Sequence, residues 1–303
     1  MKLKNRGGTK TSSFGVSKRE SHDSSVFYKR RIYEEREINE ELPELQNEVT
    51  NEVLDKVLCQ NSRDMQNIPD SSVHLMVTSP PYNVGKEYDE DMSFEEYIEL
   101  LEDVFSEAYR VLVTGGRACV NVANIGRKPY IPYHKHYIDL MLDLGFLMRG
   151  EVIWNKRAGA GVSTAWGSWM SPSNPVLRDI HEYILIFSKQ KFSRKRRKKR
   201  PTISKNEFLD CTLSVWNFQP ESAKQVGHPA PFPVELPYRC IQLYTYEGDV
   251  VLDPFCGVGT TAVAAIKTGR HYICLDNNSE YVEKARSRIE KFKTEITQND
   301  PSD

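Results

Sequence analysis

Short apolar runs alternate with longer amphipathic stretches along most of this chain. Seven runs have the length and the β-branched or aromatic content of buried strands, and they cover residues 56–59, 73–77, 118–122, 151–154, 183–187, 250–252 and 271–275. Strands that are apolar on both faces and alternate with helices are typical of a doubly wound α/β fold. The pattern therefore predicts a seven-stranded, mostly parallel sheet whose ligands bind at the carboxyl ends of the strands.

The stretch after residue 92 has the clearest helical pattern. Ser93 precedes Glu96 by three residues, which is the spacing of a capping box. The apolar positions that follow recur at helical spacing and predict core packing: Phe94, Tyr97, Ile98, Leu101, Val104, Phe105 and Ala108. A second helix is predicted near residues 134–144.

A polar, proline-rich segment ends the second predicted strand. It reads Thr78-Ser79-Pro80-Pro81-Tyr82, and its two prolines stop the hydrogen bonding of the strand. The Ser79 hydroxyl and the Pro80 carbonyl can each accept a hydrogen bond, and the Tyr82 ring can stack on a flat partner. This combination suits the binding of a planar ring that carries an amino group, although a plain strand followed by a proline turn has the same local pattern.

A glycine turn follows the strand at residues 250–252. Gly257 and Gly259 permit positive φ angles and a close approach of the backbone, and the amides behind them face the strand end. The turn lacks the third glycine of a dinucleotide fingerprint and the lysine of a phosphate loop. The next strand ends in Asp276, and a carboxylate about twenty residues past a glycine loop commonly binds ribose hydroxyls.

Together, the two segments resemble the beta class of amino-methylating DNA methyltransferases, which use S-adenosylmethionine. Residues 253–260 are similar to the cofactor motif of that family, and residues 78–82 are similar to its catalytic motif in the serine form associated with N4-cytosine methylation. The catalytic motif comes first, which is the circularly permuted order of this class. Residues 228–233 resemble the segment that introduces the cofactor motif, and the resemblance spans residues 57–289 with an interruption in the middle.

The resemblance implies a class I methyltransferase fold and direct methyl transfer to the N4 amine of a flipped-out cytosine. Ser79 and Pro80 would accept the two amino protons, and Pro81 and Tyr82 would complete the motif, with Tyr82 stacking on the base. No covalent intermediate is expected, because none of the six cysteines lies in a Pro-Cys dipeptide. The implied cofactor-binding residues are Asn61, Thr78, Asp253, Pro254, Phe255, Gly257, Gly259, Thr260 and Asp276.

One segment departs from the family pattern. Family members carry Gly-Asp-Ser before the catalytic strand, where the Asp helps to hold the cofactor adenine, whereas this chain reads Gln60-Asn61-Ser62. The Asn61 amide oxygen can still accept a hydrogen bond, and Asp64 is a nearby candidate substitute. A changed cofactor affinity is therefore expected.

Two stretches interrupt the alternation of strands and helices. Residues 155–176 are rich in Gly, Ser, Trp and Pro, and they contain Arg157 and Asn174 as candidate base contacts. Residues 189–227 lie where the resembled family has its target-recognition region, and His228 just beyond them is interpreted as structural. This second stretch contains a basic run, for which contact with DNA phosphates is predicted: Lys195, Arg196, Arg197, Lys198, Lys199 and Arg200.

Four regions follow from these assignments. Residues 1–50 are predicted to form a basic, partly ordered arm, and residues 51–188 the catalytic half of a methyltransferase domain. Residues 189–227 would be a target-recognition insert, and residues 228–303 the cofactor-binding half.

Composition narrows the class further. The net charge of −1 produces no overall attraction to nucleic acid, so DNA must be bound by local patches. The scattered cysteines predict buried thiols with neither a metal site nor disulfides. The sequence predicts no membrane span and no secretion signal. We therefore expect a cytoplasmic, nucleoid-associated protein, or a nuclear one in a eukaryote, since the basic run also resembles a nuclear localisation signal.

Other functions remain open at this point. An N6-adenine methyltransferase has the same fold, although its motif commonly begins with Asp or Asn. A catalytically inactive DNA-binding subunit would also keep the fold, and RNA is a further possible substrate. Double-stranded DNA is the expected partner, with a homodimer and a restriction endonuclease on a separate chain as possible assemblies.

Overall fold

The computed structural model of this chain describes residues 31–33, 40–82, 92–126, 129–156, 167–220 and 232–299. The chain divides into two compact units, Met1–Glu40 and Glu41–Asp303. In the first unit, Arg31–Tyr33 form a short 3-10 helix, η1. The last residues of the predicted arm, from Glu41 onward, belong to the second unit, which contains all the other helices and strands given below.

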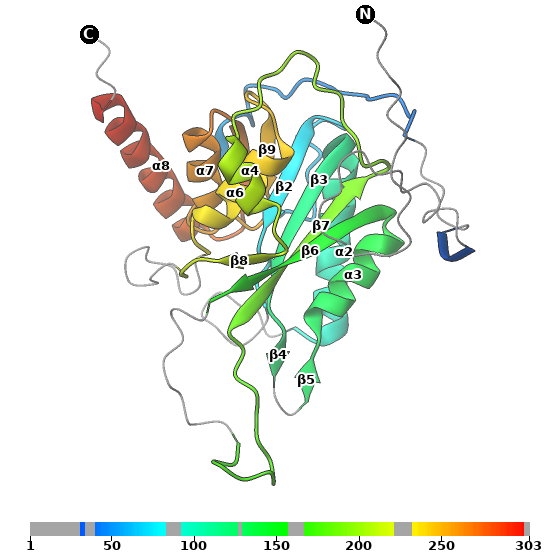
Figure 1. Cartoon of the computed structure of the whole chain (residues 1–303). Helices are drawn as coiled ribbons and strands as arrows, with labels where there is room; N and C mark the ends of the chain where they lie inside the picture. Colours follow the sequence, from blue (N-terminus) through cyan, green and yellow to red (C-terminus); the bar gives the residue numbers. More distant parts are fainter. Residues whose placement is uncertain are drawn as a thin grey trace, which may run out of the picture. The chain divides into compact units, whose positions relative to one another are not determined.

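One mixed sheet forms the centre of the second unit. Its strands are β1 (Lys56–Cys59), β2 (Val73–Thr78), β3 (Leu112–Val122), β6 (Phe146–Asn155), β7 (His181–Lys189), β8 (Val215–Asn217), β9 (Val250–Asp253) and β10 (His271–Asp276). They lie in the order β1-β10-β9-β2-β3-β7-β6-β8 (Figure 1). β7 is antiparallel to β3 and β6, and the other neighbours are parallel.

The predicted fold class is confirmed, with one strand more than expected. All seven predicted strands are present, and β8 adds an eighth within the predicted insert by pairing with β6. β8 has only three residues, of which Trp216 alone is buried. A run of this length carries no periodicity that a sequence pattern can detect, which is why the prediction missed it.

Helices cover both faces of the sheet (Figure 1). α2 (Phe94–Val111) and α3 (Tyr133–Asp143) pack on one face, and α6 (Glu235–Tyr244), α7 (Thr260–Lys267) and α8 (Ser279–Asn299) pack on the other, with α4 (Lys205–Cys211) beside α6. Along β2, Met76 belongs to the first core, whereas Leu75 and Val77 belong to the second. Both faces of the strand are therefore buried, which explains its continuous apolar run.

The predicted capping box at the start of α2 is confirmed. The Ser93 hydroxyl accepts a hydrogen bond from the Glu96 amide at 3.2 Å, and the Glu96 carboxylate accepts one from the Ser93 amide at 2.7 Å. Most of the predicted apolar stripe is fully buried, and Phe94 and Ile98 pack partly buried against the same core. None of the helices in the described part of the chain combines the length and the apolar character needed to span a bilayer.

The two edges of the sheet carry different groups. At the carboxyl edge, β2, β9 and β10 end in Thr78, Asp253 and Asp276. β3 continues there into a hairpin of β4 (Ile125–Gly126) and β5 (Tyr130–Ile131). Because β7 is antiparallel, it begins at the carboxyl edge and ends at the amino edge, so the chain after Lys189 leaves from the amino edge.

Candidate active site

The carboxylate of Asp253 connects two strand ends. Its side chain is fully buried, and it accepts hydrogen bonds from the hydroxyls of Thr78 at 2.7 Å and Thr261 at 2.6 Å, and from the amide of Phe255 at 3.2 Å. Burial raises the pKa of Asp253 to about 6, because none of these partners carries a compensating positive charge. The sequence analysis named Thr78 but missed Thr261, which holds the second carboxylate oxygen.

The glycine turn has the backbone that its sequence predicts. Gly257 and Gly259 adopt φ angles of +48° and +77°, and Gly259 caps α7. A Cβ atom at Gly259 would lie 3.1 Å from the Cβ of Ala285 on α8, so a side chain there would be crowded as well as strained by the positive φ. The neighbouring Thr260 accepts a hydrogen bond from Arg288 at 2.9 Å, which ties its hydroxyl to α8.

A cleft of about 820 Å³, measured with its open mouth, lies beside this turn. Four of the predicted cofactor-binding residues line it: Asn61, Pro254, Phe255 and Asp276. Asp276 accepts a hydrogen bond from the Gly257 amide at 2.8 Å, and burial raises its pKa. The cleft is also lined by Ser62, Arg63, Pro81, Met92, Leu100, Val104 and Asn277, whereas Asp64, considered as a substitute, is not among its lining residues.

The predicted catalytic segment borders the same cleft through Pro81. The Pro81 carbonyl accepts a hydrogen bond from the Tyr97 hydroxyl at 2.7 Å, and the Tyr82 carbonyl accepts one from the Tyr133 hydroxyl at 3.2 Å. Tyr97 comes from α2 and Tyr133 from α3, so two helices fix the backbone of the segment. The apolar stripe of α2 therefore contributes a polar contact to the site as well as core packing.

Polar side chains from β3 and β7 meet the segment that follows β2 at Ser79. The amide nitrogen of Asn121, on β3, lies 3.3 Å from the Ser79 hydroxyl, 3.2 Å from the Tyr82 hydroxyl and 2.6 Å from a carboxylate oxygen of Glu182, on β7. Lys156 forms an ion pair with Glu182. Burial raises the pKa of Tyr82, and the Glu182 carboxylate adds to this shift.

The sequence analysis missed Asn121, Glu182 and Lys156. One signal was visible, since Asn121 is a polar residue inside the apolar run at 118–122. Asn121 is 2% exposed, and its amide oxygen has no hydrogen-bond partner among the described residues. A buried acceptor without a partner is costly, so this oxygen is available to a donor that enters the site.

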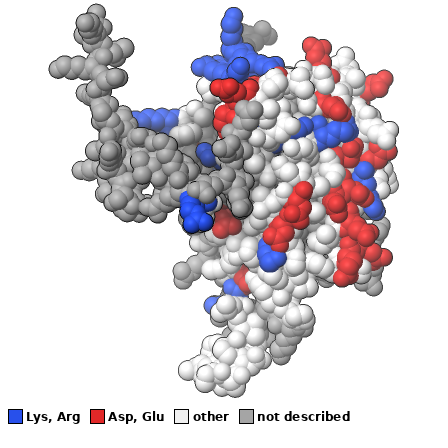
Figure 2. All heavy atoms as spheres, turned by 90° about the vertical axis from the view of Figure 1, so that its right-hand side faces the viewer, with Lys and Arg blue, Asp and Glu red and all other residues white. Residues whose placement is uncertain are grey.

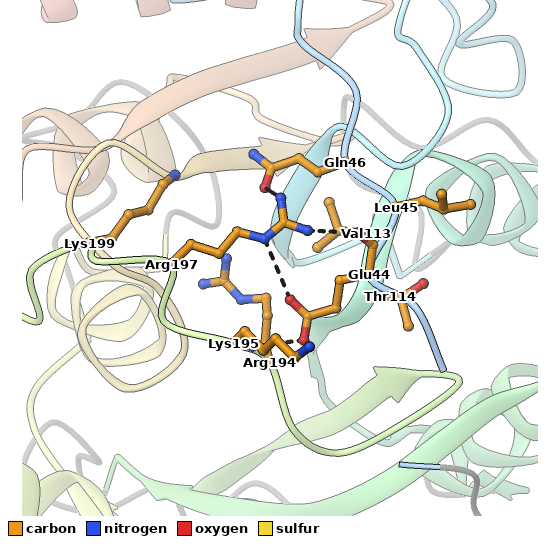
Figure 3. Close-up of a pocket in the computed structure, with 9 residues that line it drawn as sticks. All are labelled: Glu44, Leu45, Gln46, Val113, Thr114, Arg194, Lys195, Arg197 and Lys199. Atoms are coloured by element: carbon orange, nitrogen blue, oxygen red, sulfur yellow. Dashed lines mark hydrogen bonds and ion pairs between the residues drawn. The ribbon is translucent and has the colours of Figure 1, made fainter. Parts of the chain in front are cut away.

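The basic run lies at the opposite edge of the sheet from Ser79. It follows the amino-edge end of β7, and Arg194 and Lys199 form ion pairs with Asp249, the residue before β9. Figure 3 shows Arg197 reaching Glu44 and Gln46, and its guanidinium donates to the Glu44 carbonyl at 2.6 Å. The run is thus not positioned to contact a base held at Ser79, because the antiparallel β7 carries the chain away from that edge.

Several members of the basic run are nevertheless exposed. Lys195, Arg196, Lys198 and Arg200 face solvent, and Figure 2 shows a group of Lys and Arg side chains at the amino-edge end of the molecule. Phosphate contact by these residues stays a prediction. Arg157 and most of the predicted segment at 228–233 lie outside the described residues. Asn174 is described, and its backbone closes a loop with Ser168.

The fold is that of a doubly wound α/β protein, and the cleft lies at the carboxyl edge of its sheet, where proteins of this architecture bind their ligands. Residues 73–287 match the DNA methylase family N6_N4_Mtase, and the chain belongs to this family. The match confirms, at the level of the family, the resemblance carried by the two motifs. The described residues contain no cluster of His, Cys, Asp and Glu suited to a metal ion.

Individual relatives agree with the family. The chain is 31% identical over 273 residues to the Type II methyltransferase M.MthZI of Methanothermobacter thermautotrophicus. This match covers 77% of this chain and 76% of the relative. It is 34% identical over 263 residues to the Type II methyltransferase M.MjaI of Methanocaldococcus jannaschii, covering 72% and 85%. The structure of TTHA0409 from Thermus thermophilus, complexed with S-adenosyl-L-methionine, superposes with a TM-score of 0.65 at 29% identity, covering 78% of this chain and 93% of that one.

Proposed function

We propose that this chain methylates an exocyclic amine of a DNA base with S-adenosylmethionine as the donor, and that the amine is N4 of cytosine. The observation that carries the proposal is the 2.7 Å hydrogen bond between Thr78 and Asp253. It joins the strand end that precedes Ser79 to the strand end that opens the glycine turn. A base held at Ser79 and a cofactor held at the turn would therefore meet, and such positioning supplies much of the acceleration in a two-substrate reaction.

The lining of the cleft fits the parts of S-adenosylmethionine. Asp276 and Asn61 offer acceptors for ribose hydroxyls and for the adenine amine, and Phe255 and Pro81 offer apolar surface for the ring. Both oxygens of Asp253 already accept hydrogen bonds from threonines, so we infer that it reaches the amino-acid end of the cofactor through water. When bound, the cofactor supplies a methyl group on a positively charged sulfur. The relative TTHA0409, crystallised with this molecule, supports the assignment.

The residues around Ser79 would prepare the amine. An exocyclic amine is a poor nucleophile, because its lone pair is delocalised into the ring. Hydrogen bonds from its two protons to the Ser79 hydroxyl and the Pro80 carbonyl would favour a pyramidal nitrogen with a directed lone pair. Asn121 would orient Ser79, and its buried amide oxygen offers a further acceptor. The target base must leave the duplex to reach these groups, and Tyr82 would stack on it.

The choice of cytosine rests on the serine at the start of the motif. In the resembled family this form accompanies N4-cytosine methylation, and N6-adenine methylation commonly uses Asp or Asn. We further infer from the Type II methyltransferase relatives that the chain acts on duplex DNA beside a restriction endonuclease encoded as a separate chain.

The test is mass spectrometry of nucleosides from duplex DNA treated with the protein and S-adenosylmethionine. We expect N4-methylcytosine, and Ser79→Ala should lower its rate of formation by about 10- to 100-fold, since a lost hydrogen bond of this kind costs about 1–3 kcal/mol. Cofactor binding, measured by calorimetry, should not change. Ser287→Ala, on the exposed face of α8, is the matched control and should behave as wild type.

Other products would separate the parts of the proposal. N6-methyladenine as the product would contradict the choice of cytosine, but it would still support methylation of an exocyclic amine at this site. Cofactor binding without any methylated nucleoside would contradict DNA methylation itself.

A further inference from the structure

A closed loop projects from the sheet between β6 and β7. Its neck is made by hydrogen bonds from the Ser168 amide to the Asn174 carbonyl at 2.8 Å and from the Asn174 amide to the Ser168 hydroxyl at 3.0 Å. A backbone bridge between Gly167 and Pro175 lies next to this neck. We call residues 168–174 the tip loop. These contacts give the tip loop a defined shape that does not depend on a partner.

The tip loop presents large apolar side chains to solvent. Trp169 is 71% exposed and Met170 is 88% exposed, and Met170 adopts a φ angle of +47°. A left-handed conformation is unfavourable for such a residue, so the turn that exposes it is held against a local preference. Single exposed apolar residues are common, but two adjacent ones at the end of a closed loop are a candidate contact surface.

The tip loop also carries no charge. Residues 167–177 contain no Lys, Arg, Asp or Glu, and the described part of the protrusion at the carboxyl-edge end is white in Figure 2. A surface that binds DNA phosphates needs positive charge. An uncharged apolar tip is suited instead to the interior of the duplex, where bases stack.

The two ends of the connection between β6 and β7, which carries the tip loop, lie beside the candidate active site. The Lys156 amide, at the end of β6, donates to the Ile180 carbonyl at 2.7 Å, and Glu182 follows two residues later. Glu182 contacts Asn121 at 2.6 Å, and Asn121 contacts Ser79 at 3.3 Å. Figure 1 shows the segment extending from the edge that carries β4 and β5. A duplex presented to Ser79 would therefore lie within the region into which the loop projects.

We propose that Trp169 and Met170 enter the base stack of the DNA at the position that the target base vacates. The inference rests on the proposed function and adds a duplex-opening role to it. Removing a base from the stack costs free energy, and an apolar wedge that fills the gap lowers that cost. The partner of this surface is duplex DNA, and the wedge is needed only while the target base is paired.

The experiment compares paired and mispaired targets. The wild-type protein first identifies its own site by sequencing of methylated DNA. Methylation is then measured on two duplexes of that site, one fully paired and one with a mismatch opposite the target base. Trp169→Ala should slow methylation of the paired duplex by about 10-fold or more, as expected for loss of an aromatic stacking contact, and the mismatch should restore most of the rate. Leu177→Ala removes a large apolar side chain that is 85% exposed and lies outside the tip loop, and it should leave both rates unchanged.

Each other outcome is informative. A wild-type rate with Trp169→Ala, or an equal loss on both duplexes, would overturn the wedge and leave the methyltransferase assignment standing. Loss of a dimer in Trp169→Ala by analytical ultracentrifugation would also overturn it, since the loop would then contact a second copy. If the wild-type protein methylates no DNA, the proposed function itself fails.

Discussion

Two buried aspartates at opposite edges of the same sheet differ in the charge around them. Asp249, at the amino edge, and Asp253, at the carboxyl edge, are both fully buried and lie four positions apart. Burial alone would raise the pKa of Asp249, yet the neighbouring His74 and the ion pairs with Arg194 and Lys199 lower it to about 2. Asp253 has hydroxyl and amide partners instead, and burial raises its pKa to about 6.

The difference in charge distinguishes a structural role at the amino edge from a candidate binding role at the carboxyl edge. At the amino edge, charged groups satisfy one another and fasten the chain after β7 to the sheet. The turn there places Arg197 and Lys198 at φ angles of +46° and +63°, and Arg196 holds it by donating to the Lys199 carbonyl at 2.7 Å. At the carboxyl edge, Asp253 is held by neutral hydrogen bonds, and the cleft beside it is lined by polar groups that a ligand could contact. Two aspartates at opposite ends of β9 thus have opposite roles, because the groups around them differ.

The largest expected effect comes from removing the charge at the amino edge. Asp249→Asn leaves Arg194 and Lys199 without their carboxylate, and losing one partner of a buried ion pair typically costs about 3–5 kcal/mol. The midpoint of urea unfolding should fall accordingly. The control is Glu247→Gln. Its ion pair with Arg200 is exposed, so the substitution should lower the free energy of unfolding by about 1 kcal/mol or less. An equal loss of stability in both variants would show that the buried ion pairs of Asp249 contribute no more than the exposed pair of Glu247.

The two aspartates should also respond to pH in opposite directions. Asp253 has a folded-state pKa of about 6 against its usual 3.8, so its contribution to stability is present at low pH and is lost as the pH rises through 6. This difference between the folded-state pKa and the usual pKa of Asp253 corresponds to about 3 kcal/mol of folding stability. The contribution of Asp249 is present above its usual 3.8 and is lost as the pH falls toward 2.

Urea unfolding of wild type and Asp253→Asn between pH 4 and 7.5 measures this contrast. Wild type should gain stability relative to the variant as the pH falls through this range. Parallel curves for the two proteins would show that Asp253 does not titrate in this window.

A smaller effect is expected from the polar cluster at Ser79. Glu182→Gln removes the partner of Lys156 and weakens the contact that orients Asn121, so methylation should slow by about 10-fold, which corresponds to about 1.4 kcal/mol. Calorimetry should show unchanged cofactor binding. Glu151→Gln, at an exposed position on β6, is the control, and an equal change in both variants would exclude a specific role for Glu182.

The smallest effect on folding is expected from the exposed lysines of the basic run. Replacing Lys195 and Lys198 by Ala should change the free energy of unfolding by less than about 0.5 kcal/mol. If the two lysines contact phosphates as the sequence predicts, the slope of the logarithm of the DNA-binding constant against the logarithm of salt concentration should become shallower by about 2. An unchanged slope would show that the amino edge does not touch the DNA.

Local patterns predicted the elements that depend on neighbouring residues. The capping box of α2, its apolar stripe, the seven longer strands of the sheet and the glycine turn were predicted correctly, because each has a sequence pattern within a few neighbouring positions. The network of Asn121, Glu182 and Lys156 was not found, because Asn121 and Glu182 meet only through the pairing of β3 with β7. The place of the basic run was likewise hidden, since it depends on β7 being antiparallel.

By itself, the sequence determined the α/β class, the two motifs at the strand ends and the family that carries them. Only the tertiary structure decided which strand ends adjoin, which acidic groups are balanced by charge and which edge the basic run occupies. The physical reason is range: secondary structure and turns follow from neighbouring side chains, whereas strand order and direction are set by how separate apolar faces pack together.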